Sequence, residues 1–208
     1  MAQYFSVHPK DPQPRLIRLA AQILRDGGVV AYPTDSSYAL GCQVGNADAA
    51  KRMLQIRGLG EGHFLTLVCR DLVHAGRYVS IANWQFRIIR QGIPGSFTFI
   101  LPATREVPRR LTNPKRRSVG IRVPDHPVVR ALLAELDEPI LSTTLILPGA
   151  EAPLNDPNEI RERLETRIDL VIDAGPCPAV PTTVVDLANE PGTIVREGGG
   201  DPARIGLA

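Results

Sequence analysis

Apolar residues follow two spacings along this chain, and the two spacings alternate. In residues 14–26 they recur every three or four positions, with Pro14 near the start and two glycines beyond the end, which predicts a helix. Residues 29–32 then form a continuous apolar run of the kind found in buried strands. Asn46 has the side chain of a helix cap, so a second helix is expected from residue 47 to about residue 56.

The same alternation continues toward the C-terminus. Further helices are expected around residues 84–89, ending before Gly92, at 127–136 and at 159–167, the last opened by Asp156 and Pro157. The expected strands are residues 64–69, 97–101, 118–123, 140–144, 170–172, 183–187 and 193–196. Glycines at 58, 60 and 62 predict a flexible loop before the first of these strands. Strands that alternate with helices indicate an α/β fold.

Length and composition limit the number of domains. A chain of 208 residues with 43% hydrophobic and 22% charged residues can bury one sizeable core. No repeat, low-complexity tract or linker divides the sequence. We therefore expect a single domain over residues 1–208, with its core in about residues 14–200.

Charge is unevenly distributed, although the net charge is only +2. Residues 1–104 carry 11 basic and 6 acidic residues, a balance of +5, and residues 105–208 carry 13 and 16, a balance of −3. Residues 105–122, here called the basic segment, contain seven basic residues and one acidic residue. Such a segment suits a polyanion such as structured RNA or a triphosphate, and a solvated loop is the alternative. The candidate RNA-binding residues are Arg109, Arg110, Lys115, Arg116 and Arg117.

Several classes of function are not expected. The few aromatic residues near the basic segment argue against stacking of single-stranded bases, and no motif predicts sequence-specific reading of DNA. Three distant cysteines argue against a disulfide scaffold or a zinc site and favour a reducing, cytoplasmic compartment, with Cys42 and Cys69 as buried thiols. The four histidines show no metal-ligand spacing, so no protein-bound metal is predicted. Neither a signal peptide nor a membrane span is indicated, and P-loop and G-x-S-x-G motifs are absent.

The hydroxyl-rich segment YPTDSSYALGC, residues 32–42, leaves the first predicted strand. On its own it could be a polar turn or the wall of a binding pocket. It resembles the first motif of the threonylcarbamoyl-AMP synthase family, also called the YrdC/YciO family, and with Ser36 and Ala39 its form is most like the YciO branch. The resemblance recurs in order at Arg57 and at residues 94–101, 119–127, 141–144, 181–186 and 194–198.

This resemblance implies a fold and a reaction. The fold is a twisted, open, mixed sheet flanked by helices, with the site in a concave basic face. In the family reaction, L-threonine and bicarbonate give a carbamate, which attacks the α-phosphate of ATP and releases pyrophosphate. The product, threonylcarbamoyl-AMP, serves the modification of tRNA to threonylcarbamoyladenosine. Mg²⁺ is expected to arrive with the nucleotide.

The resemblance also implies roles for residues of this sequence. Arg57 is expected to hold the ATP phosphates, and Arg122 to meet the carboxylate of the amino acid. Arg57 and Thr144 are the candidate catalytic residues. The remaining candidates are Thr34, Ser36, Tyr38, Ser142 and Thr182 for the substrate, and Ser118, Thr144 and Arg196 for the nucleotide.

Two departures from the family pattern matter for activity. Gln55 stands where the family has a lysine, and Ile146 stands where it has an asparagine. Losing one preorganised donor typically costs roughly 3–4 kcal/mol of transition-state stabilisation. Arg52 lies on the same predicted helix but projects elsewhere, so it is a poor substitute. Two hypotheses follow: a nucleotidyltransferase with weakened or altered chemistry, and a non-catalytic protein that binds double-stranded RNA through the basic segment.

Overall fold

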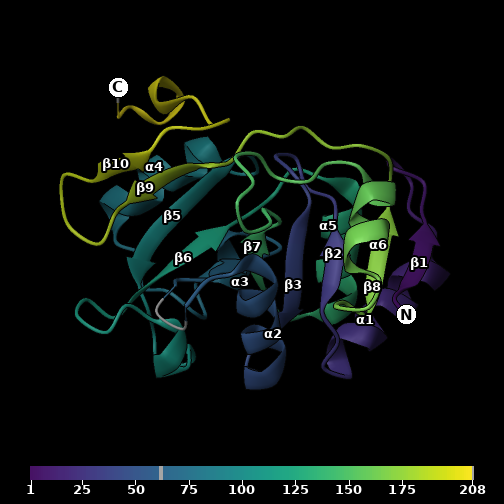
Figure 1. The fold of residues 1–208 in the computed structure, drawn as a ribbon. Coiled ribbons are helices and arrows are strands. Elements are labelled where there is room, and N and C mark those ends of the chain that lie inside the picture. The colour runs from purple at the N-terminus through teal and green to yellow at the C-terminus, as the bar shows by residue number, and fades with distance from the viewer. Residues whose placement is uncertain (61–62, 208) are drawn as a thin grey trace.

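The computed structural model, which describes residues 1–60 and 63–207, confirms the α/β fold (Figure 1). Ten strands form one sheet in the order β1-β8-β2-β3-β7-β4-β6-β5-β9-β10. Four neighbouring pairs are parallel and five are antiparallel, so the sheet is mixed, as expected. The strands are β1 (Gln3–Ser6), β2 (Val30–Tyr32), β3 (Ala39–Gln43), β4 (Thr66–Val68), β5 (Phe97–Pro102), β6 (Ser118–Arg122), β7 (Ile140–Thr144), β8 (Leu170–Asp173), β9 (Thr183–Asp186) and β10 (Thr193–Arg196).

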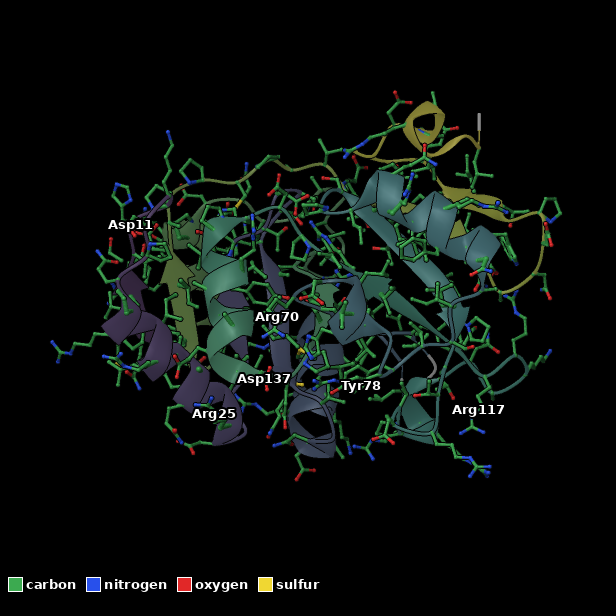
Figure 2. The ribbon with its side chains drawn as sticks, turned by 180° about the vertical axis from the view of Figure 1, so that it is seen from behind. Asp11, Arg25, Arg70, Tyr78, Arg117 and Asp137 are labelled. Atoms are coloured by element: carbon green, nitrogen blue, oxygen red, sulfur yellow. The ribbon has the colours of Figure 1, made fainter. Side chains whose placement is uncertain are left out.

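Helices cover the sheet from both sides. They are α1 (Pro14–Arg25), α2 (Ala47–Arg57), α3 (Leu72–Ala75), α4 (Asn83–Gly92), α5 (Pro127–Leu136) and α6 (Pro157–Leu164), with 3-10 turns η1 (Arg109–Leu111) and η2 (Pro202–Ile205). From behind, α1 and α5 lie side by side over one end of the sheet (Figure 2), where their apolar faces pack on β2 and β8. On the opposite face, α2 and α6 bury their apolar residues against β3 and β8.

Local signals explain where the helices begin and end. The Oδ1 atom of Asn46 accepts a hydrogen bond from the backbone N–H of Ala49 at 2.9 Å, which caps α2 as predicted. Pro127 opens α5, where the side chain of His126 caps the helix, so this histidine has the structural role expected of a turn residue. Of the loop predicted at residues 58–62, residues 61 and 62 lie outside the described part of the chain.

The core agrees with the expectations from the cysteines. Cys42 and Cys69 are buried free thiols, as predicted, and Cys177 is buried as well. Burial raises the pKa of Cys42 and Cys69 to about 12, so both thiols stay protonated and unreactive at neutral pH. Within the described residues, no helix combines the length and the apolar character needed to cross a bilayer.

His74 makes the stability of the core dependent on pH. Its side chain is only 2% exposed, and its Nε2 atom has no hydrogen-bond partner among the described residues. Burial, assisted by the charges of Arg70 and Arg77, lowers the pKa of His74 below that of an unfolded histidine. Below the unfolded pKa of about 6.5, the imidazole of His74 is protonated in the unfolded chain but stays neutral in the folded state. Acid therefore favours unfolding.

We therefore expect the free energy of unfolding to fall as pH decreases from 7 toward 5. His74→Phe should reduce this slope without removing it, because burial also lowers the pKa of His63 and His126. Urea titrations at several pH values measure the slope. His8→Gln, the loss of an exposed imidazole, is the control; an unchanged slope in His74→Phe would refute the assignment.

Candidate functional site

A cavity of about 380 Å³ opens on the sheet between β7 and β10. Ala39 and Val68 belong both to its lining and to the apolar cluster under α1 and α5, so the cavity begins where those helices stop covering the sheet. Six of the candidate site residues line it, namely Arg57, Arg122, Ser142, Thr144, Thr182 and Arg196. Residues up to 139 positions apart in the sequence are thus brought to one site.

Strand register explains why polar side chains meet on this part of the sheet. Thr66 on β4 lies opposite Ser142 on β7 and Gly120 on β6, and Gly120 lies opposite Ile100 on β5. Directly opposed residues project from the same face of a sheet, so these four form one row across the cavity floor. A Cβ atom at Gly120 would come within 3.2 Å of the Thr66 hydroxyl, so the absence of a side chain at this position leaves space above the cavity floor.

Arg57 enters the cavity from the C-terminal end of α2. The helix ends at Gly58, whose left-handed backbone (φ 64°) turns the chain away directly after Arg57. One guanidinium nitrogen, Nη1, donates to the carbonyl oxygen of Ile146. The Nε atom is buried and has no partner among the described residues, and burial lowers the pKa of the group. Arg57 therefore offers a donor that an anionic ligand could satisfy.

Arg122 is held at the end of β6 by a buried ion pair. Its Nη2 atom donates to Asp35 at 2.6 Å and to the hydroxyl of Thr34 at 3.2 Å, and the side chains of Arg122 and Asp35 are only 8% and 14% exposed. Asp35 also accepts a hydrogen bond from Ser96 at 2.8 Å. The Nε atom of Arg122 is buried without a partner in the described chain. Asp35 and Ser96 lie within segments that carry the family resemblance, but sequence reasoning assigned them no role.

Arg196 lies at the opposite side of the cavity, on β10. It donates to the carbonyl oxygen of Thr182 through Nη2 at 2.9 Å and through Nε at 3.3 Å. The Thr182 hydroxyl in turn lies 2.9 Å from that of Thr98 on β5. Burial lowers the pKa of Arg196. Three guanidinium groups from three elements thus surround one cavity.

Four other candidates lie outside the cavity lining. Thr34 is buried behind Arg122, and its hydroxyl donates to the carbonyl oxygen of Ser37 at 2.6 Å while lying 3.2 Å from that of Ser36. Tyr38 is buried, and its phenol donates to the carbonyl oxygen of Gly175 at 2.9 Å. Ser118 is buried at the far end of β6, opposite Pro102. Here Thr34 supports the site through Arg122, whereas Ser36, Tyr38 and Ser118 have no direct access to the cavity.

Among the lining residues to which the sequence assigned no role, two lie beside Arg57. His63 and Phe64 follow the glycine loop and line the cavity beside Arg57. Burial and the positive charge of Arg57 lower the pKa of His63, which favours its neutral form. The sequence carried no signal for Phe64, because residues 64–69 were predicted as a strand, and its 50% exposure is visible only in the fold.

The two departures from the family pattern lie close to Arg57. Gln55 is exposed on α2, whereas Ile146 lines the cavity and accepts a hydrogen bond from Arg57 through its carbonyl oxygen. Arg52 forms an ion pair with Asp169 at 3.0 Å, which confirms that it does not replace the missing cation.

A divalent cation would find no carboxylate in this cavity. The described lining residues include no Asp or Glu, and no group of three metal-binding side chains occurs among the described residues. The side chains present therefore fit a metal ion that is coordinated by ligand phosphates rather than by the protein.

The basic segment lies at the other end of the sheet from the N-terminus, and Figure 2 shows Arg117 on its projecting loop. All five candidate RNA-binding residues are exposed. Two of them have partners: Arg110 donates to the carbonyl oxygen of Gly45 at 2.6 Å, and Arg116 pairs with Asp186 at 2.7 Å. Arg116 thus ties the segment to β9.

Comparison with known proteins agrees with this geometry. The YciO protein of Escherichia coli K12 is 50% identical over 201 residues, which cover 97% of this chain and 98% of that protein. The threonylcarbamoyl-AMP synthase of Halorhodospira halophila is 36% identical over 166 residues, covering 79% of this chain and 85% of the relative. Both matches cover most of this chain and most of the relative, so the similarity concerns the whole fold rather than a single motif.

Solved structures show the same likeness. The crystal structure of E. coli YciO matches with a TM-score of 0.95 and 49% identity, over 99% of this chain and 100% of the other. The structure of P. abyssi Sua5 complexed with L-threonine matches with a TM-score of 0.86 and 25% identity, over 94% of this chain and 57% of Sua5. The Sua5/YciO/YrdC family model, described by the words "Telomere recombination", matches residues 22–198. With the ordered motifs, the fold and these matches in agreement, the chain belongs to the Sua5/YciO/YrdC family.

Proposed function

We propose that the cavity binds ATP and L-threonine or a closely related amino acid, and forms threonylcarbamoyl-AMP for tRNA modification at a reduced rate. The observation that carries this proposal is the convergence of Arg57, Arg122 and Arg196, two of which hold a buried Nε donor without a partner in the described chain. Guanidinium groups suit both phosphate and carboxylate, which this pair of substrates supplies. A relative that is 36% identical is named threonylcarbamoyl-AMP synthase, and the Sua5 structure contains L-threonine.

The proposed reaction assigns a task to each side of the cavity. The carbamate oxygen bonds to the α-phosphorus while the bond to pyrophosphate breaks, so negative charge moves onto the leaving phosphate oxygens. Arg57 and Arg196 would stabilise that charge, and Arg122 would hold the carboxylate of the amino acid. Mg²⁺ bound by the triphosphate would neutralise further charge.

The direct test is incubation of the protein with ATP, Mg²⁺, L-threonine and bicarbonate, followed by measurement of pyrophosphate and the adenylate product. Threonine-dependent product, formed slowly, supports the proposal. If the protein binds ATP but yields no adenylate over many hours, the synthase activity is refuted and the cavity only binds the nucleotide.

Arg57 is expected to dominate ATP binding. Because charge-assisted hydrogen bonds are worth about 1.5–3 kcal/mol, Arg57→Met should weaken ATP binding by about ten- to a hundredfold. Arg52→Met is a matched control: it removes the same side chain from the same helix, but Arg52 pairs with Asp169 outside the cavity. Calorimetric titration with ATP separates the two variants, and equal affinities would contradict this role of Arg57.

A second candidate function is binding of structured RNA by the basic segment. The observation in its favour is that Arg109, Lys115 and Arg117 are exposed and make no side-chain hydrogen bond or ion pair among the described residues. Such cations would contact phosphates and make affinity dependent on salt.

Replacing Arg109, Lys115 and Arg117 together by glutamine should lower the slope of log affinity against log salt by about two to three. Arg116 is left intact because its loss would break the pair with Asp186. The matched control replaces Lys10, Arg15 and Arg18, three exposed cations at the N-terminal end. Filter binding of duplex RNA at several salt concentrations gives the slopes. Equal slopes for the two triple variants would exclude the basic segment as the RNA-binding surface.

A further inference from the structure

A second cavity, of about 270 Å³, opens between α2, the residues at the start of β4 and η1. Among the described residues it shares only His63 and Leu65 with the first cavity, between β7 and β10, and the three arginines of the first cavity do not line it. The residues that α2 contributes, at positions 47, 48, 50, 51 and 54, are spaced as one face of a helix. The proposed reaction leaves this second cavity without a ligand.

The floor of the second cavity is apolar and buried. Four aliphatic side chains that line it are each at most 8% exposed, namely Ala50, Leu54, Leu65 and Leu111. The described lining residues include no hydroxyl or amide side chain. Because such a floor offers no side-chain hydrogen bond, it favours the apolar body of a ligand over a polar group. The volume lies near the lower end of the range for ligand pockets, about 300 Å³, so the ligand is small.

The rim of the second cavity is charged. Lys51 and Arg110 line the cavity and are exposed, and Lys51 makes no hydrogen bond or ion pair among the described residues. Arg110 donates through Nη2 to the carbonyl oxygen of Gly45 at 2.6 Å, which holds its guanidinium group at the rim. Its Nη1 and Nε atoms make no hydrogen bond within the described chain. Asp48 is the one acidic residue in the described lining, so two cations face one carboxylate.

We propose that the second cavity binds a small amphipathic monocarboxylate, with its ring or branched chain on the apolar floor and its carboxylate paired with Lys51 and Arg110. The planar guanidinium fork of Arg110 matches a carboxylate, and the ammonium group of Lys51 adds a second positive charge. Asp48 at the same rim repels further negative charge, so a monoanion fits better than a phosphate ester. The inference stands apart from the proposed function, because it requires neither ATP nor L-threonine.

Two ligands of opposite charge test this proposal. 4-Phenylbutyrate and 4-phenylbutylamine carry the same ring on a similar chain, but at pH 7 the first is an anion and the second a cation. Because exposed ion pairs are individually weak and two of them contribute, the acid should bind about three- to tenfold more tightly than the amine. Ligand-detected NMR titrations measure both affinities. Inorganic phosphate, which has charge but no apolar body, should not displace the acid.

Three variants test the floor and the rim separately. Ala50→Leu fills the floor and should weaken binding of 4-phenylbutyrate by about tenfold or more. The free energy of unfolding in urea should not fall, because the leucine enters open space. Lys51→Gln should weaken the acid by about two- to fourfold. Lys115→Gln, which removes an exposed cation of the basic segment outside both cavities, is the matched control and should leave the affinity unchanged.

Several results would overturn the inference. Equal binding of the acid and the amine would mean that the rim does not select charge, and equal weakening in Lys51→Gln and Lys115→Gln would mean a general attraction to the basic segment. Binding that is weakened by Arg57→Met but not by Ala50→Leu would place the acid in the first cavity. Absence of binding of either ligand would remove the site altogether. Each of these results leaves the proposed function standing, because none of them measures ATP or L-threonine.

Discussion

Replacing Arg122 by methionine is expected to lower the free energy of unfolding by about 3–5 kcal/mol, because it leaves the carboxylate of Asp35 buried without its counter-ion. The pair is short, 2.6 Å, and its two side chains are only 8% and 14% exposed. The same substitution should abolish binding of the amino acid if Arg122 meets its carboxylate. Urea unfolding at pH 7 measures the first effect, and calorimetric titration with L-threonine measures the second.

A second variant separates stability from recognition. Asp35→Asn combined with Arg122→Met removes both charges, and the asparagine oxygen can still accept the hydrogen bond from Ser96. This double variant should regain more than half of the lost stability, whereas binding of L-threonine should stay lost. Recovery of threonine binding in the double variant would show that Arg122 acts on the fold alone.

Restoring the two missing family donors should have the largest effect on catalysis. Gln55→Lys combined with Ile146→Asn adds a cation near the C-terminal end of α2 and an amide in the cavity wall. Each restored donor is worth roughly 3–4 kcal/mol when it is aligned, so each should raise the rate of adenylate formation by about a hundred- to a thousandfold and the pair should raise it further. The lysine is also compatible with the helix, because cations are favourable near the helix C-terminus.

The single variants make this expectation testable. Because Gln55 is exposed and Ile146 lines the cavity, Ile146→Asn should act mainly on the rate, and Gln55→Lys on both ATP binding and the rate. Lys51→Gln removes an exposed cation one turn earlier on α2, outside this cavity, and serves as a charge control. A double variant no faster than the wild type, with ATP still bound, would mean that these two positions do not limit adenylate formation.

Most elements could be predicted because their signals are local. The bounds of α5, β7 and β10 agree with the predicted ranges, and α1 and α2 differ from theirs by one residue. The helix predicted at residues 159–167 was shifted along the chain, because α6 begins at Pro157 and ends at Leu164, before the turn that leads into β8. Helix periodicity and capping residues need no knowledge of distant partners.

The missed strands, β1 and β3, depend on pairing with residues far away in the sequence. β3 lies inside the hydroxyl-rich segment, and its strand conformation comes from pairing with β2 on one side and β7 on the other. β1 is a short, half-exposed edge strand whose partner, β8, lies more than 160 residues away. Such pairing leaves little trace in the local pattern of hydrophobic residues.

The candidate site was predicted in the same uneven way. Arginines in recognisable segments could be assigned from resemblance, and three of them line the cavity. The supporting contacts could not be predicted, because Asp35 lies 87 residues from Arg122 and Tyr32 lies 110 residues from Ser142. Whether a serine donates or accepts depends on such neighbours, which only the fold brings together.

The most direct test of the account is calorimetric titration of the wild-type protein with ATP and Mg²⁺, with and without L-threonine. We predict one ATP per chain, L-threonine binding to the same protein, and ATP binding that is weakened about ten- to a hundredfold in Arg57→Met but unchanged in Arg52→Met. A protein that binds neither ligand, or that binds ATP equally well without Arg57, would contradict the claim that this cavity is a nucleotide and amino-acid site.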